Sequence, residues 1–274
     1  MTAISTTPAT SNPAVTANRG RFVWTELMTN DIVRARDFYT KVIGWTTKNW
    51  NGANKEYVTW LAGETPIGGL MPLPEDAKAM GTPPSWLAYV EVPDVDATVE
   101  QAVKLGAKVL APKMVIPDVG RLAVLRDPQG AVIAVITSAK VPQPETDPRP
   151  LEFSWHELVT TDQVGAIDFY QKLFGWDSKG DFDMEEGKGT YKMFGRDRFT
   201  YGGVMTKPSD MPVPSHWLHY ISVKDSADAA AERATKAGGK LMLGPMEVPG
   251  GDRIAILTDP QGAMFAVHSK PTVK

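Results

Sequence analysis

The chain of 274 residues has no cysteine, so disulfides, thiolate metal ligands and cysteine nucleophiles are excluded. It also lacks any run of Lys or Arg. With a formal net charge of −3, it carries no electrostatic signature of a nucleic-acid partner. The apolar runs reach only the length of a strand, so no membrane span is expected. Among known catalytic motifs, the nucleophile elbow, the zinc-protease helix and the phosphate loop are all absent from the sequence.

The first 20 residues lack the basic start and the apolar segment of a secretory signal. They are rich in Thr, Ala, Ser and Pro, a composition that predicts a disordered tail over residues 1–20. A cytoplasmic location is the default expectation for such a chain.

What the sequence does contain is a duplication. The segment Trp24–Trp45 returns as Trp155–Trp176, and 13 of the 22 positions are identical. A long match at one fixed offset indicates a tandem repeat, and the chain length alone also suggests two domains. We predict a first domain over residues 21–138, a Pro-rich linker over 139–150 and a second domain over 151–274.

Both copies predict the same local elements. Trp24 and Glu26 alternate with other side chains as in a strand, and Asp31 can cap the helix that follows. The apolar series of this helix begins at Val33, and the helix ends at Gly44. A second strand, helix and hairpin complete each half, and the hairpins turn at 127–130 and 259–262. Each half is therefore predicted to contain two consecutive modules, each made of a strand, a helix and three strands.

These motifs resemble the glyoxalase/bleomycin-resistance/dioxygenase superfamily, also called vicinal oxygen chelate proteins. The resemblance lies in D…FY…GW, then in VPDVDA…LGA, then in GR-x-A-x-L-x-DPQGA, and it covers nearly the whole chain once per half. The motifs are similar to those of two-domain glyoxalase-like proteins of actinobacteria. The resemblance implies an α+β fold of two tandem domains, each with two βαβββ modules forming a concave mixed sheet, here called a cup. It also implies that the halves pair as an intrachain pseudo-dimer.

Metalloenzymes of this superfamily bind one divalent ion through His, Glu or Gln side chains from four strands. The resemblance carries these positions onto Trp24, Gly69, Leu87 and Ala134, and in the second half onto Trp155, Gly203, Leu218 and Ala266. Indole and aliphatic side chains do not bind such cations. The expectation is therefore no metal and no other cofactor, with a divalent metal as the alternative.

Aromatic and polar side chains are expected to line the cups instead. The expected lining is Trp24, Glu26 and Tyr89 in the first cup, and Trp155, Glu157, Tyr220 and His268 in the second. Flat apolar faces with a few hydrogen-bonding groups suit a small aromatic or apolar organic ligand. Arg121 and Arg253 recur at matching positions and could bind a ligand carboxylate or phosphate, or form salt bridges.

Glu157 and His268 are the candidate catalytic residues. Strand alternation places both toward the second cup, where they could form an acid/base pair or half of a shifted metal site. The alternatives are a structural pair or an exposed His268. Ile136 stands at the equivalent position of the first half, so the second cup is expected to be the more functional one. His156 is expected in the core.

Three hypotheses follow. The first is metal-free binding of a small organic molecule for sequestration, sensing or resistance. The second is a glyoxalase- or hydroxylase-type enzyme that uses a shifted metal site or metal-free acid/base chemistry. The third is an interaction protein whose cups are vestigial.

Overall fold

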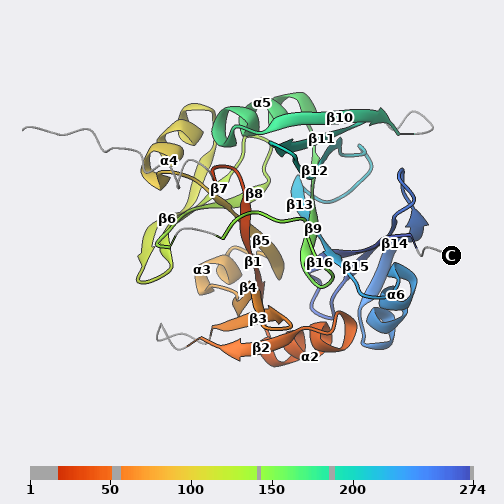
Figure 1. The fold of residues 1–274 in the computed structure, drawn as a ribbon. Helices are drawn as coiled ribbons and strands as arrows, with labels where there is room; N and C mark the ends of the chain where they lie inside the picture. Colours follow the sequence, from red (N-terminus) through yellow and green to blue (C-terminus); the bar gives the residue numbers. More distant parts are fainter. Residues whose placement is uncertain (1–17, 51–56, 141–142, 185–188, 272–274) are drawn as a thin grey trace, which may run out of the picture.

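A computed structural model describes residues 18–50, 57–140, 143–184 and 189–271. The protein is α+β, and its two halves each contain one eight-stranded mixed sheet with helices packed on one face (Figure 1). Most of the expected disordered tail, residues 1–17, lies outside the described residues. No helix in the described part of the chain is long and apolar enough to span a membrane.

The first half contains two modules of strand, helix and three strands, joined by a short extra helix. Its elements are β1 (Phe22–Thr29), α2 (Ile32–Val42), β2 (Thr46–Asn49), β3 (Val58–Ala62), β4 (Thr65–Pro72), α3 (Glu75–Ala79), β5 (Ser85–Glu91), α4 (Val95–Lys104), β6 (Lys108–Ile116), β7 (Gly120–Arg126) and β8 (Val132–Ser138). The predicted order of strand, helix and three strands is confirmed in both modules, and α3 lies in the connection between them.

The second half repeats this order, and its described residues form no extra helix between the modules. Its elements are β9 (Phe153–Thr160), α5 (Gln163–Phe174), β10 (Asp177–Asp183), β11 (Thr190–Arg196), β12 (Phe199–Thr206), β13 (His216–Ser222), α6 (Ala227–Lys236), β14 (Lys240–Glu247), β15 (Arg253–Thr258) and β16 (Met264–Ser269).

The two modules of each half meet along one antiparallel pair of strands. In the first half the strand order is β2-β3-β4-β1-β5-β8-β7-β6, with β1 and β5 at the junction. Within the modules, β1 pairs in parallel with β4, and β5 pairs in parallel with β8. The second half has the same arrangement, with β9 and β13 at the junction. One concave face per half results.

The helix boundaries follow the predicted capping residues. The Asp31 carboxylate accepts the backbone N–H of Arg34 and so caps α2. Val33, in contrast, was expected on the buried face and is 56% exposed, as is its counterpart Val164 at 72%. Each valine precedes the buried phenylalanine of its helix by five residues. Five residues turn a helix by about 140° beyond a full turn, so these valines face solvent.

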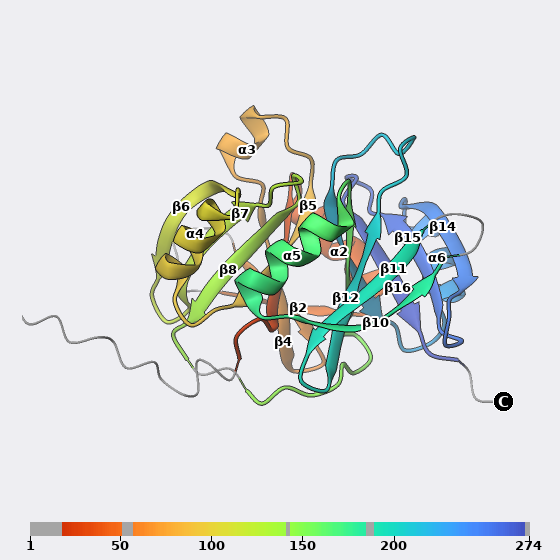
Figure 2. The ribbon, with the colours of Figure 1, turned by 90° about the horizontal axis from the view of Figure 1, so that it is seen from above.

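Helices from opposite halves share the same hydrophobic cores. One core contains the buried faces of α2 and α6, and the other contains those of α4 and α5. Figures 1 and 2 show α4 beside α5, and Figure 1 shows α2 beside α6 at the opposite side of the molecule. The first module of each half therefore buries its helix against the second module of the other half.

The repeated Phe-Tyr and Asp-Pro-Gln-Gly motifs meet across this interface. The hydroxyl of Tyr170 on α5 donates to Asp127 Oδ2 in the β7–β8 turn at 2.9 Å. In the other core, Tyr39 makes the equivalent bond to Asp259 at 3.4 Å. Each aspartate also accepts backbone N–H groups of its own turn, so one buried carboxylate holds both the turn and the opposite helix.

The segment before β1 also crosses between the halves. The Gly20 N–H donates to the carbonyl of Glu91 at 2.8 Å, and the indole N–H of Trp176 donates to the Gly20 carbonyl at 2.6 Å. Residues 18–20 were expected in the disordered tail. The structure describes these three residues as a turn, in which Gly20 makes the two hydrogen bonds to Glu91 and Trp176.

Candidate functional site

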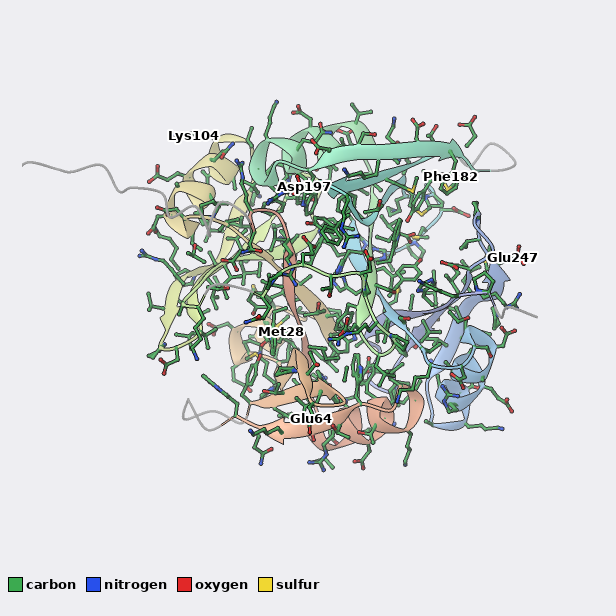
Figure 3. All side chains as sticks on the ribbon, viewed as in Figure 1. Met28, Glu64, Lys104, Phe182, Asp197 and Glu247 are labelled. Carbon is green, nitrogen blue, oxygen red and sulfur yellow. The ribbon has the colours of Figure 1, made fainter. Side chains whose placement is uncertain are left out.

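Alternation along the central strands sends one set of side chains to each concave face. Trp24 and Met28 of β1 pack there with Leu87 and Tyr89 of β5, whereas Leu27 enters the shared helical core. The second cup has the equivalent cluster of Trp155, Leu218, Tyr220 and Ala266. Met28 is labelled in Figure 3, as is Phe182, whose ring stacks on Tyr191 in the second half.

In the first cup, a buried carboxylate organises the expected residues. The Tyr89 hydroxyl donates to Glu26 Oε2 at 2.8 Å, and Glu26 is only 5% exposed. Tyr57 also hydrogen-bonds to Glu26, and the Trp24 indole N–H donates to the Tyr57 hydroxyl at 2.9 Å. The structure therefore brings together Trp24, Glu26 and Tyr89, which were expected to line this cup. It does so through Tyr57, which was not predicted.

The second cup repeats this network. Tyr191 and Tyr220 donate their hydroxyl protons to Glu157 Oε2 at 2.9 Å and 3.2 Å. The indole N–H of Trp155 donates to the Tyr191 hydroxyl at 2.8 Å. Each cup thus contains one glutamate held by two tyrosines, with a half-buried tryptophan at the edge of the network.

Tyr57 and Tyr191 occupy space that glycine leaves free. A Cβ atom on Gly69 would lie 2.0 Å from the Tyr57 hydroxyl, and one on Gly203 would lie 2.0 Å from the Tyr191 ring. These glycines stand at positions where the resemblance places metal ligands. The sequence signal that could have identified both tyrosines is the Tyr that precedes each Gly-Gly pair by the same spacing in both halves.

Burial dominates the electrostatics of both networks. It raises the pKa of Glu26 and of Glu157, and hydrogen bonds from the surrounding tyrosines offset this only in part. The same burial, together with the nearby carboxylate, raises the pKa of Tyr89 and of Tyr220. The tyrosines therefore remain proton donors, and the glutamates are suited to hold or exchange a proton.

The expected pairing of Glu157 with His268 is not formed. His268 instead contacts Ser154 and Asp252. The reason is strand direction. β9 is antiparallel to β13, and β13 is parallel to β16, so β9 and β16 run in opposite directions. Moving two residues along each strand from Trp155 and Ala266 therefore separates Glu157 from His268 instead of bringing them together.

Arg121 and Arg253 lie on the face of their strands opposite the cups. Arg121 forms an ion pair with Asp96 in the first turn of α4, and Arg253 binds Asp228 of α6 through two nitrogens at 2.7 Å and 2.8 Å. Their neighbours Leu122 and Ile254 are the residues that face the cups. Of the two alternatives for these arginines, the structure therefore shows the salt bridges.

The remaining histidines sit in the centre of the molecule or at its surface. His156 is buried, as expected, and its Nδ1 lies 2.9 Å from Nδ1 of His219, while the Phe22 ring stacks on it. Burial lowers the pKa of both, that of His219 to about 3. His216 bonds to the Pro214 carbonyl and does not contribute to this pair.

The side chains in the cups do not fit a divalent metal. Each network contains a single carboxylate whose lone pairs accept tyrosine hydroxyls, and no imidazole enters it. Within the described ranges, no three His, Asp or Glu side chains converge in the way a metal ion requires.

Two of the surface depressions formed by the described residues lie outside the cups. One, of about 320 Å³, lies between α2 and Pro260, and one of about 180 Å³ lies between α5 and the β10–β12 strands. Neither contains a residue of the glutamate networks. The glutamate networks, in contrast, have the same chemistry in both halves.

The comparison with protein families decides the assignment. The model of the Glyoxalase/Bleomycin resistance protein/Dioxygenase superfamily matches twice, over residues 21–135 and 152–267. The chain belongs to this superfamily.

Two relatives align with nearly the whole length of this chain. CFP32 of Mycobacterium tuberculosis, a protein provisionally named a glyoxylase, is 34% identical over 248 residues, which cover 89% of this chain and 92% of that protein. The anthracycline biosynthesis protein DnrV of Streptomyces peucetius is 29% identical over 264 residues, with 90% and 92% covered.

Solved structures of superfamily members share the fold at low identity. The Mn(II)-bound glyoxalase of Novosphingobium aromaticivorans has a TM-score of 0.60 at 16% identity, with 93% of this chain and 83% of that chain covered. The 2,3-dioxygenase LapB of Pseudomonas sp. KL28 has a TM-score of 0.62 at 12% identity, with 93% and 94% covered. At these identities the likeness shows the fold alone.

Proposed function

We propose that this superfamily member binds a flat, largely apolar organic molecule in its cups without a metal ion. The observation that carries the proposal is the repeated network of tryptophan, glutamate and two tyrosines. In both halves the tryptophan of this network occupies a position where the resemblance places a metal ligand, and a glycine at another such position makes room for one of the tyrosines. Such a ligand role agrees with sequestration, sensing or resistance.

Partly exposed apolar side chains surround each network. In the first cup these include Trp24, Met28, Val124 and Val132, and in the second Trp155, Ile254, Ile256 and Met264. This surface offers contact area to a planar molecule, and the hydroxyl oxygens of the network beneath it can accept a hydrogen bond from one or two polar groups of the ligand. Planar polycyclic phenols have this combination of properties. One relative carries a name that places it in anthracycline biosynthesis, which supports this ligand class.

Proton transfer to the bound molecule is the second candidate function. Burial raises the pKa of Glu157, and two tyrosine hydroxyls hold the carboxyl group in place. A carboxyl group of raised pKa can act as an acid or a base near neutral pH without a metal. Its substrate would be a ligand of the same class that carries an ionisable hydroxyl or an enolisable carbonyl group.

Titration of a hydroxyanthraquinone into the chelator-treated full chain tests the binding proposal, with quenching of tryptophan fluorescence as the readout. Trp24→Ala and Trp155→Ala should each weaken binding in one cup by about tenfold or more, because each removes an aromatic contact and its buried area. Met80→Ala is the control, since Met80 is 76% exposed and lies outside the cups. An affinity unchanged in both tryptophan variants would place the ligand elsewhere.

A further inference from the structure

A serine, a histidine and an aspartate form a continuous chain of hydrogen bonds beside the second cup. Ser154 Oγ lies 3.1 Å from Nδ1 of His268, and Nε2 of His268 lies 2.8 Å from Oδ2 of Asp252. The His268 side chain is 16% exposed and that of Asp252 35%, so the three are accessible without being fully solvated. The three residues come from β9, β16 and the turn before β15.

The aspartate determines which nitrogen of His268 carries the proton. An ionised carboxylate can only accept, so Nε2 is the nitrogen that donates to Asp252. In the neutral ring, Nδ1 then has a free lone pair directed at Ser154 Oγ. The serine hydroxyl has a second acceptor, the Tyr220 carbonyl, at the longer distance of 3.5 Å.

Local backbone geometry places this serine toward the cup. The pairing of β9 with β13 skips one residue between Phe153 and Trp155, which leaves Ser154 in a β-bulge. A bulge turns the extra side chain toward the face of its neighbour, here that of Trp155. Asp252 follows Gly250 and Gly251, both at positive φ, which turn the chain sharply before β15.

The first half has no counterpart of this arrangement. Val23, Ile136 and Gly120 stand at the positions equivalent to Ser154, His268 and Asp252. A Cβ atom on Gly120 would lie 2.3 Å from the Thr137 carbonyl oxygen, so an aspartate could not replace this glycine without moving the backbone. The duplication therefore provides an apolar version of the same site within one chain.

We propose that Ser154, His268 and Asp252 form an acyl-transfer site in which Ser154 is the nucleophile. Such a site is recognised by geometry and by the role of each group, not by sequence order. Ser154 Oγ forms a bond to the carbonyl carbon of an ester as its proton passes to Nδ1 of His268. The carbonyl π electrons move to oxygen and return as the bond to the alkoxide breaks, and His268 gives its proton to that alkoxide. Water then attacks the acyl-serine by the same steps and releases a carboxylic acid.

Trp155 adjoins the nucleophile and suggests the substrate class. An ester of an aromatic alcohol could place its ring on Trp155 and its acyl carbon at Ser154. The aromatic preference rests on the proposed function, whereas the acyl chemistry does not. Asp252 acts as a positioning residue, since it orients His268 and does not touch the substrate.

Labelling of the folded full chain with a biotinylated alkyl fluorophosphonate tests the nucleophile. Ser154 Oγ should displace fluoride from phosphorus, and peptide mass spectrometry should locate one adduct at Ser154. The adduct should disappear in Ser154→Ala and after heat denaturation. His268→Ala and Asp252→Asn should slow labelling by about tenfold or more. Labelling that is absent from the folded protein, or that persists in Ser154→Ala, would overturn the proposal.

Control variants separate a specific site from a reactive surface serine. Ser138→Ala should label as the unmodified protein does, because Ser138 binds Glu91 and no histidine. Val23→Ser should add no second adduct, because the first half has no histidine beside it. Nitrogen NMR should find the His268 proton on Nε2, and Asp252→Asn should shift this tautomer balance while the unfolding midpoint stays the same. An unchanged tautomer balance would exclude the assigned role of Asp252.

Hydrolysis of phenyl acetate and trifluoroethyl acetate distinguishes the two proposals. Trp155→Ala should lower the rate ratio of the phenyl ester to the trifluoroethyl ester and leave labelling intact. A ratio unaffected by this change would contradict aromatic binding at this cup but not the acyl chemistry. If the unmodified protein shows neither ester hydrolysis nor labelling at Ser154, the acyl chemistry is contradicted, whereas the binding proposal is not.

Discussion

We predict that position 69 tolerates only glycine, because a larger side chain there would collide with Tyr57. The backbone at position 69 has no positive φ, so alanine meets no conformational barrier there. A Cβ atom would lie 2.0 Å from the Tyr57 hydroxyl and 2.6 Å from its Cζ atom. The substitution Gly69→Ala should therefore push the tyrosine ring away from Glu26.

Two effects set the expected loss of stability. Forcing one extra methyl group into packed side chains costs about 1–3 kcal/mol. Moving Tyr57 away from Glu26 also weakens a hydrogen bond to a buried carboxyl group, which costs about 1–3 kcal/mol more. Together they predict that Gly69→Ala lowers the free energy of unfolding by about 2–6 kcal/mol, a large part of the stability of a typical domain.

Urea unfolding followed by circular dichroism can measure this in a double-mutant cycle. In a Tyr57→Ala background the steric conflict is gone, so adding Gly69→Ala should cost less than about 1 kcal/mol. Gly68→Ala is the matched control, because its Cβ would lie 2.3 Å from the backbone carbonyl oxygen of Thr25. That cost should persist in the Tyr57→Ala background. Equal costs of Gly69→Ala in both backgrounds would show that a collision with Tyr57 is not the cause of the lost stability.

Three further predictions concern the carboxylates and the interface. Because burial raises the pKa of Glu157 above 4.5, the stability it contributes at low pH is lost as pH rises through the folded pKa. The neutral Glu157→Gln variant should thus gain stability relative to the unmodified protein as pH rises from 4.5 to the raised pKa of Glu157, and a difference independent of pH would contradict this. Tyr170→Phe should cost about 1–3 kcal/mol in urea unfolding, because buried Asp127 loses a donor; a cost below about 0.5 kcal/mol would show that the bond is unimportant. Proteolysis at an engineered site in the 139–150 linker should leave halves that stay associated or aggregate on gel filtration, and two stable monomers would contradict the shared cores.

Much of the fold could be predicted because its signals are local and occur twice. Asp31 and Gly44 mark the ends of a helix within a dozen residues of chain, and the repeat confirms each assignment independently. Alternation along a single strand likewise placed Trp24 and Glu26 on one face. The repeat also predicted that the halves would differ at the positions of Ile136 and His268.

Relations between strands were harder to predict. The direction of β16 relative to β9 decides whether Glu157 meets His268, and neither strand carries that information in its own residues. The Arg121 side chain was placed by its position in the sequence, whereas its orientation depends on the register of β7. Tyr57 was missed because its partner Glu26 is on another strand and Gly69, which makes room for it, is on a third.

The central claim is that the cups bind an organic molecule without a metal ion. The most direct test is to titrate a hydroxyanthraquinone by calorimetry into the full chain after exhaustive chelation, and again after loading with Mn²⁺, Fe²⁺ or Zn²⁺. We expect the same dissociation constant in every case and well under one bound metal ion per chain by elemental analysis. Binding that appears only after metal loading, with one tightly held ion that Glu157→Gln removes, would contradict it.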